Sequence, residues 1–312
     1  MDFFDILLDR QTPLFHPGDL IVGKIVISLS KKVKVNKIKI LLNGIANVGW
    51  LEDKTSRNDT KYVHANKNYI HLDLILIENK SMEAGRHKFP FSIKLPDTLP
   101  SSFQDNHGSI SYSLKALFDI PWNFEKSTKK DLTIYSNVDL NSFVGLAEPK
   151  TVSVRRSSGF ELFENNNIRI TLAVDKTGFA PGEPVIFTAT IQNETSKDLK
   201  HIKMNLVQNC KFNIDNESKE IQKKISTIEY ANHVAKKSTQ KWLCSNWILP
   251  QTCPSSVDEF DLVKISYNLE LKMTASIGFK KWKEKMFCYL FSTKVSLAKI
   301  SWNTWMNFGC EN

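Results

Sequence analysis

The sequence lacks the features that define several classes of protein. It has no run of about 18 apolar residues, the length that a membrane-spanning helix needs. The amino-terminal segment MDFFDILLDRQTP is interrupted by aspartates and has no basic residues ahead of its apolar stretch, which argues against a secretory signal. The five cysteines form no C-x-x-C pair, so neither a disulfide framework nor a zinc site is expected. These absences favour a cytoplasmic protein with reduced thiols.

Motifs that carry catalytic chemistry are also missing. The sequence has no G-x-G-x-x-G, P-loop, G-x-S-x-G or H-E-x-x-H pattern, so the commonest nucleotide, hydrolase and metalloprotease sites are excluded. The seven histidines show no ligand spacing. We therefore expect no catalytic residue, no cofactor and no metal. A triad assembled from distant residues stays open as an alternative, because such triads leave no local pattern.

The composition is that of an ordinary globular protein. Hydrophobic residues make up 41% of the 312 residues and charged residues 24%, which excludes wholesale disorder, collagen and coiled coil. This length is too great for one compact sandwich and suits two domains of about 150 residues each. The formal net charge is +9, and nucleic-acid binding is not expected because no nucleic-acid-binding motif accompanies the charge.

Apolar and polar residues alternate over many short segments, most clearly at 20–27, 33–42, 70–76 and 89–95. Such alternation places apolar side chains on one face of a strand and polar side chains on the other, as in antiparallel sheets with one buried face. Turn signals recur at short intervals, which is the rhythm of a sandwich. The fold is therefore predicted to be all-β, with only 219–239 ambiguous.

An internal repeat is the most informative feature. Residues 15–44 align without a gap with residues 179–208, and a second block near 100–114 matches one near 254–269. Each Pro-Gly pair fits a type II turn. The two tyrosines matched by the repeat, Tyr112 and Tyr267, are expected to bury their rings while each hydroxyl forms a hydrogen bond. The residues to which we assign a structural role are Pro17, Gly18, Pro100, Ser101, Ser102, Phe103, Gly108, Tyr112, Pro181, Gly182 and Tyr267.

The repeat divides the chain into domains. We expect an amino-terminal sandwich at 1–147, a linker at 148–158 around Pro149, a carboxy-terminal sandwich at 159–276, and a basic and aromatic tail at 277–312. Because each half repeats the other, the two sandwiches are predicted to be copies of one module.

Two basic segments are candidate contacts for an anionic partner, either acidic lipid or a phosphorylated peptide. The alternative is a solvated outer face that also protects a strand edge. The tail segment interleaves cations with aromatic residues, as suits a membrane interface, but an ordinary amphipathic element fits equally well. The candidate residues are Lys31, Lys32, Lys34, Lys37, Lys39, Lys280, Lys281, Lys283 and Lys285.

Two long segments resemble the arrestin-domain-containing proteins, or alpha-arrestins. HKFPFSIKLPDTLPSSFQDNHGSISYSLKALFDIPW at 87–122, followed by NVDLN at 137–141, is similar to the family's amino-domain signature. GFAPGEPVIFTATIQNETSKDLKHIKMNLVQ at 178–208 is similar to the opening of its carboxy-terminal domain. The likeness runs from about Phe3 to about Leu271. Beyond about Ile277 the family's closing strand is not recognisable, so the second sandwich is expected to be incomplete or divergent.

The resemblance implies two immunoglobulin-like sandwiches in tandem and a non-catalytic adaptor. Such an adaptor would bind membrane cargo or receptors, couple them to endocytic or ubiquitin-ligase machinery, and associate peripherally with the plasma membrane or endosomes. The P-P-x-Y motif by which alpha-arrestins recruit ligases is absent, since the sequence has no Pro-Pro pair. A structural subunit of a retromer-like sorting coat is the alternative function.

Overall fold

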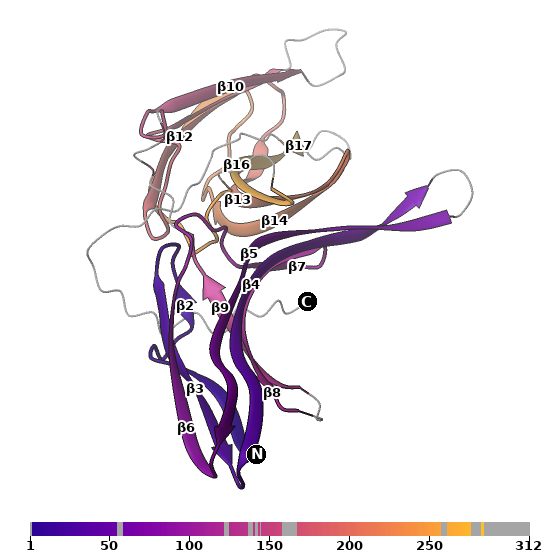
Figure 1. Ribbon diagram of the computed structural model, residues 1–312. Helices are drawn as coiled ribbons and strands as arrows, with labels where there is room; N and C mark the ends of the chain where they lie inside the picture. The colour runs from indigo at the N-terminus through magenta and orange to yellow at the C-terminus, as the bar shows by residue number, and fades with distance from the viewer. Residues whose placement is uncertain are drawn as a thin grey trace.

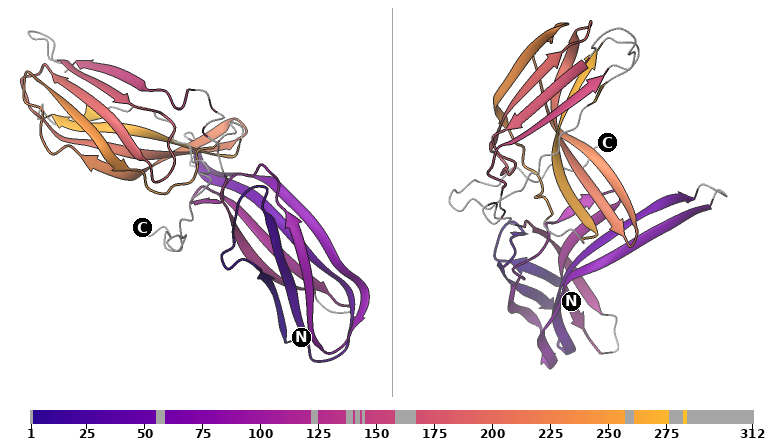
Figure 2. Two further views of the ribbon diagram at one scale, coloured as in Figure 1. Left: turned by 90° about the vertical axis from the view of Figure 1, so that its left-hand side faces the viewer. Right: turned by 90° about the horizontal axis from the view of Figure 1, so that it is seen from above.

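The computed structural model describes residues 2–54, 59–121, 125–136, 140, 143, 145–157, 167–256, 261–275 and 282–283. The secondary-structure elements of this part of the chain are β-strands, joined by turns and loops. The strands form two lobes that meet near the middle of the molecule, as Figure 1 and the two views of Figure 2 show. The predicted all-β fold with two tandem sandwiches is confirmed.

The first lobe contains two sheets. One has the strand order β1-β3-β6, and the other has the order β2-β9-β8-β4-β5 with β7 paired to β8. Their bounds are β1 Phe3–Leu8, β2 Leu14–Phe15, β3 Leu20–Leu29, β4 Val33–Lys54, β5 Asp59–Met82, β6 Gly85–Lys94, β7 Phe103–Asp105, β8 Gly108–Asp119 and β9 Lys126–Ile134.

The second lobe also contains two sheets, with the orders β10-β11-β12-β15 and β14-β13-β16-β17. Their bounds are β10 Lys150–Ser157, β11 Asn167–Val174, β12 Pro184–Asn193, β13 Leu199–Ile214, β14 Glu217–Glu229, β15 Ser238–Ile248, β16 Val263–Ala275 and β17 Trp282–Lys283.

The pairing pattern of the two lobes is the same. In the first lobe β3 lies between β1 and β6, and in the second lobe β12 lies between β11 and β15. Likewise β4 lies between β5 and β8, as β13 lies between β14 and β16. The internal repeat of the sequence is therefore a repeat of strand pairings, as a duplicated module requires.

Alternating side chains build the two cores. On β3 the inward residues Ile21, Ile25 and Ile27 are fully buried, while Leu20 and Val22 on the other face are exposed. The rings of two matched tyrosines are buried, and each hydroxyl donates to a backbone carbonyl at 2.7 Å, Tyr112 to Pro100 and Tyr267 to Cys253. Both copies thus tie the loop before the strand to the core by the same bond, as expected.

The two Pro-Gly turns also match. Gly18 and Gly182 have φ of 79° and 86°, and the residue after each glycine donates its N–H to the carbonyl of the residue before the proline, Asp19 to His16 and Glu183 to Ala180. These are the predicted type II turns, in which positive φ at the third position favours glycine.

Two boundaries differ from the sequence-based expectation. The linker predicted at 148–158 contains β10, which pairs with β11 over Lys150–Ser157 because Val152 and Val154 alternate with polar residues. The segment expected to be a divergent tail contains β17, which pairs with β16 as β9 pairs with β8.

The ambiguous region 219–239 is mostly strand, since β14 continues to Glu229.

Strands β4 and β5 are much longer than their repeated counterparts. They pair with each other from Val33 and Met82 to Lys54 and Asp59, whereas β8 pairs with β4 only as far as Val48. The outer part of this hairpin therefore projects beyond the sheet, and in Figure 1 it runs below the second lobe.

The turn glycines give a direct test of the fold. Replacing Gly182 by Val should lower the free energy of unfolding by about 1–2 kcal/mol, because a β-branched residue is strained at positive φ. Apart from its two chain neighbours, no described residue has an atom within 4 Å of the position that a Cβ would take, so the loss would come from the backbone. Urea unfolding measures it.

The matched control is Gly182→Asn, because asparagine tolerates this conformation. It should lose clearly less stability than Gly182→Val. Equal losses in the two variants, or no loss in either, would contradict the turn assignment.

Candidate functional site

The two lobes meet along a seam that draws on distant parts of the sequence. Its first-lobe residues come from β5, from β7 with the turn and the start of β8 that follow it, and from the segments next to β7 and β9. Its second-lobe residues come from β13 and from the segment before β16. We call this contact the interdomain seam. It consists of Lys67, Tyr69, Ser102, Phe103, His107, Gly108 and Tyr135 of the first lobe with Phe212, Thr252, Cys253 and Asp261 of the second.

A buried carboxylate lies at one end of the seam. Asp261 is 7% exposed, and its Oδ1 accepts hydrogen bonds from Lys67 Nζ at 2.8 Å and from the Tyr69 hydroxyl at 2.9 Å. Both donors stand on β5, two residues apart and therefore on the same face of the strand. A carboxylate removed from water is costly unless charged and polar partners replace the solvent. This contact therefore holds the second lobe against β5.

Aromatic packing forms the middle of the seam. The Phe212 ring lies 6.3 Å from the Phe103 ring and 5.9 Å from the His107 ring, centroid to centroid. Gly108 permits this approach, because a Cβ there would lie 2.9 Å from the Phe212 ring and 3.1 Å from the Asn47 carbonyl. The absence of a side chain at Gly108 thus allows the β7–β8 turn to touch the second lobe.

Cysteine and tyrosine complete the seam on its other side. Cys253 Sγ lies 3.9 Å from the Ser102 carbonyl, and the Tyr135 hydroxyl donates to the Thr252 carbonyl at 3.2 Å. Burial raises the pKa of the Cys253 thiol. Burial, and next the Asp105 carboxylate, raise the pKa of Cys210 to about 12. Both thiols are therefore protonated at neutral pH and poorly nucleophilic.

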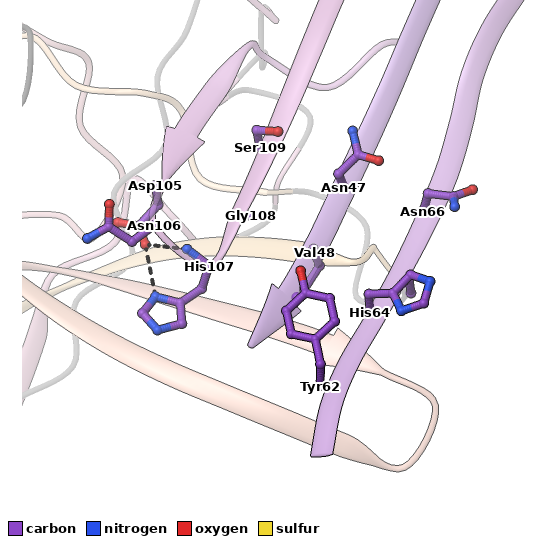
Figure 3. Close-up of a pocket in the computed structure, with 12 residues that line it drawn as sticks. Asn47, Val48, Tyr62, His64, Asn66, Asp105, Asn106, His107, Gly108 and Ser109 are labelled. Carbon is purple, nitrogen blue, oxygen red and sulfur yellow. Dashed lines mark hydrogen bonds and ion pairs between the residues drawn. The ribbon is translucent and has the colours of Figure 1, made fainter. Parts of the chain in front are cut away.

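A cavity of about 310 Å³ lies beside the seam, at the root of the long hairpin. Figure 3 labels residues of its lining, which come from β4, β5, the end of β7, the β7–β8 turn and the start of β8. The Gly49 N–H donates to the His107 carbonyl at 2.9 Å and so fixes the turn against β4. The polar side chains of its lining are Asn47, Tyr62, His64, Asn66, Asp105, Asn106, His107 and Ser109.

The lining can donate and accept hydrogen bonds but is poor in fixed charge. Its one carboxylate, Asp105, accepts from the His107 backbone N–H at 3.3 Å and lies 3.4 Å from His107 Nδ1. The Tyr62 and His64 rings stack at 5.8 Å. Carboxamides such as those of Asn47 and Asn66 each offer donors and an acceptor, which suits peptide groups of a bound chain. The cavity is therefore equipped for recognition of neutral polar groups.

The predicted basic segment on the first lobe lies at the start of β4. Val35, Ile38 and Ile40 point into the core as expected. Two of the five lysines have partners within the chain, since Lys32 pairs with Glu83 and Lys39 pairs with Asp73. Lys31, Lys34 and Lys37 form no ion pair with another residue that the structure describes. Their role as anionic contacts remains a prediction.

The other predicted anionic contacts are the four lysines of the tail segment. Lys280, Lys281 and Lys285 lie outside the described residues, as does the side chain of Lys283 in β17. Among the residues described, the structure has no group of three or more side chains able to hold a metal ion. The same residues include no helix long and apolar enough to cross a membrane.

Sequence reasoning gave Ser102, Phe103 and Gly108 a structural role, but it missed the other residues of the seam and the cavity and the contact between the lobes. Lys67 and Asp261 are 194 positions apart, and no motif or periodicity links such distant positions. The Pro-Ser-Ser segments pointed to the right loops, because Ser102 and Cys253 lie in or next to them. Nothing in the sequence indicated that these two loops face each other.

Comparison with known proteins matches both lobes. Residues 4–141 match the family "Arrestin (or S-antigen), N-terminal domain", and residues 164–288 match "Arrestin (or S-antigen), C-terminal domain". The second match continues past Ile277, where the likeness was expected to end.

Several curated proteins are similar over most of the chain. Arrestin domain-containing protein 1 of Mus musculus is 25% identical over 281 residues, 88% of this chain and 62% of the relative. Arrestin domain-containing protein 17 of Caenorhabditis elegans is 27% identical over 293 residues, 89% of this chain and 68% of the relative. Arrestin domain-containing protein 4 of Homo sapiens is 24% identical over 272 residues, 84% of this chain and 64% of the relative. The chain thus spans about two thirds of the length of these relatives.

The seam can be tested through its buried carboxylate. Replacing Asp261 by Ala removes the acceptor shared by Lys67 and Tyr69, and should lower the free energy of unfolding by about 2 kcal/mol. Loosening of the seam should also expose Cys253, so its alkylation by iodoacetamide should become faster relative to that of Cys210. Mass spectrometry of the labelled peptides measures both rates.

Asp73→Ala is the matched control, since Asp73 accepts a comparable bond from Lys39 on the outer face of the sheet. An exposed pair of this kind contributes little stability, and Cys253 should react as in the parent protein. An unchanged Cys253 rate in Asp261→Ala would show that the seam does not depend on this carboxylate.

Proposed function

Because the chain belongs to the arrestin family and resembles its arrestin-domain-containing (alpha-arrestin) members, we propose that it is a non-catalytic adaptor. It would bind membrane cargo or receptors and couple them to endocytic or ubiquitin-ligase machinery. Arrestin-domain proteins act in general as non-enzymatic trafficking and signalling adaptors. The proposals on cargo binding, ligase coupling and membrane contact rest on surface features of this chain.

The cavity at the root of the hairpin is the observation that carries the proposal. It is open and polar. It lies next to the seam, where His107 of its lining contacts Phe212, so a partner bound in it would be within reach of both lobes. The carboxamides and imidazoles of its lining suit hydrogen bonding to a peptide, and its one carboxylate is already engaged by His107. A site of this kind favours binding over chemistry.

Coupling to a ligase would use a route other than P-P-x-Y within these residues, because they contain no Pro-Pro pair. The exposed edges and loops of the two lobes are the surfaces available for it. We place the protein in the cytoplasm, peripherally associated with the plasma membrane or endosomes. Lys31 and Lys34 support this placement because both are exposed and have no acidic partner in the described part of the chain.

Filling the cavity should reduce cargo binding. Asn66→Trp places a large ring among the lining residues, and proximity labelling with the full chain should then recover fewer membrane proteins than the parent does. Asn68→Trp is the control, because Asn68 is also exposed on β5 but does not line the cavity. Equal recovery by both variants would exclude the cavity as a cargo contact. Labelling of no membrane protein even by the parent would exclude the adaptor role.

Membrane contact should depend on charge. Replacing Lys31 and Lys34 together by Glu should lower binding to phosphatidylserine vesicles by at least about tenfold, since each basic residue near an anionic surface contributes about 1 kcal/mol. Cosedimentation at low salt measures this, and raised salt should weaken the parent's binding too. Binding that neither the substitutions nor salt changes would exclude these lysines as lipid contacts.

A further inference from the structure

One edge of the first lobe is open to strand pairing. β5 is the last strand of its sheet, and in the described part of the chain it pairs with β4 alone. Every second residue of an edge strand directs its N–H and C=O away from the sheet. These groups can be satisfied by water or by another strand.

Between its two bulges, at Tyr69 and Leu76, this edge carries little of the protection that natural edge strands have. Its stretch from Tyr69 to Ile77 reads YIHLDLILI, with no proline, no lysine and a single acid, Asp73. Ile75 is 51% exposed. Long, apolar, β-prone edges are normally interrupted by charge, proline or bulges because they invite pairing with another chain. An unprotected edge of this kind is therefore a candidate for a binding surface.

The regular part of the edge is short and has defined ends. At one end, the seam engages Lys67 and Tyr69 with Asp261. At the other end, the register shifts so that Leu76 is an extra residue, and Asn79 has a φ of 46°. A bulge leaves one residue out of the ladder and twists the strand, which interrupts regular pairing along its free edge. The usable window is therefore Ile70–Ile75, a length that suits a short linear segment.

The side chains of the window define what it could accept. Leu72 and Leu74 pack only partly buried against the core. The strand that follows β5 after a short turn, β6, is an edge strand of the other sheet. On the outer face, Asp73 pairs with Lys39 and His71 contacts Asn43. An added strand would thus cover Leu72 and Leu74 on one face and meet His71, Asp73 and the exposed Ile75 on the other.

We propose that the β5 window binds an extended peptide segment of a partner by strand addition. The inference rests on the proposed adaptor function, so the segment would belong to the cytosolic part of a membrane protein. Backbone hydrogen bonds to β5 would supply affinity. Aliphatic side chains at every second position would cover Leu72 and Leu74, and the residue opposite Asp73 would be neutral or basic.

A second copy of the chain fits this window less well. In antiparallel pairing, opposed residues point to the same face. Two-fold pairing centred on Asp73 would oppose the two Asp73 carboxylates. Centring on Leu72 would oppose Ile75 and Tyr69, whose hydroxyl the seam already engages. Centring on Leu74 would bring the bulged Leu76 into the ladder. A linear peptide meets none of these obstacles.

The test uses the full chain and a blocked nine-residue peptide in which valines alternate with threonines between terminal lysines. Two further versions carry N-methyl groups on one or the other set of alternate residues. Fluorescence anisotropy should show binding of the parent peptide, and methylation of the set that faces β5 should weaken it by more than about tenfold, because several backbone bonds are lost. Methylation of the other set should have little effect.

Ile75→Lys should weaken binding of the parent peptide by about fivefold, because Ile75 lies on the outer face and would lose its cross-strand contact with a threonine methyl group of the peptide. Ile186→Lys is the matched control, because Ile186 is also exposed but stands on an interior strand of the second lobe. Failure of the parent peptide to bind, equal binding of both methylated peptides, or unchanged binding by Ile75→Lys would overturn the inference. So would a dimer of the parent that Ile75→Lys dissociates. Cargo recovery that persists in any of these cases would leave the adaptor function standing.

Discussion

The arrangement of the two lobes depends on a carboxylate that has been removed from water. Asp261 belongs to the second lobe, but both donors that satisfy it, Lys67 and Tyr69, belong to β5 of the first. Separating the lobes would break both hydrogen bonds, and water would have to replace them at all three side chains. Together with Phe212, which packs against the β7–β8 turn, this contact turns two sandwiches into one body. It also fixes the place of the cavity and one end of the free β5 edge.

The duplication explains the rest of the scaffold and shows where the copies have diverged. Both lobes keep the same strand pairings, the same Pro-Gly turn and the same tyrosine bond to a loop carbonyl. The first lobe differs in its long β4–β5 hairpin, whereas the second adds β10 to one of its sheets. The cavity and the open edge both lie on the extended hairpin. The lining of the cavity draws on these longer strands, whereas the edge position is common to both copies, since β14 ends its sheet as β5 does.

Much of the fold could be predicted from the sequence because short-range physics determines it. Alternation at Ile21, Ile25 and Ile27 gives the buried face of a strand, and Pro17-Gly18 specifies its turn. The outer half of the hairpin was not predicted, because Asn47, Lys61 and Asn66 resemble loop residues and only pairing with the facing strand makes them extended. The seam was not predictable either, since Asp261 meets Lys67 only after both modules have folded. Repeats reveal what the two halves share and say nothing about how they dock.

The most direct measurement of this account is native-state hydrogen exchange across the seam. If Asp261 joins the lobes into one body, the amides of β5 around Lys67 and Tyr69 and those at the start of β16 should open together, with a free energy well above that of the exposed loops. Substitution of Asp261 should lower that shared value while the amides of β3 and β12 stay protected. Rapid and independent exchange on the two sides of the seam in the parent protein, with both cores intact, would contradict the account.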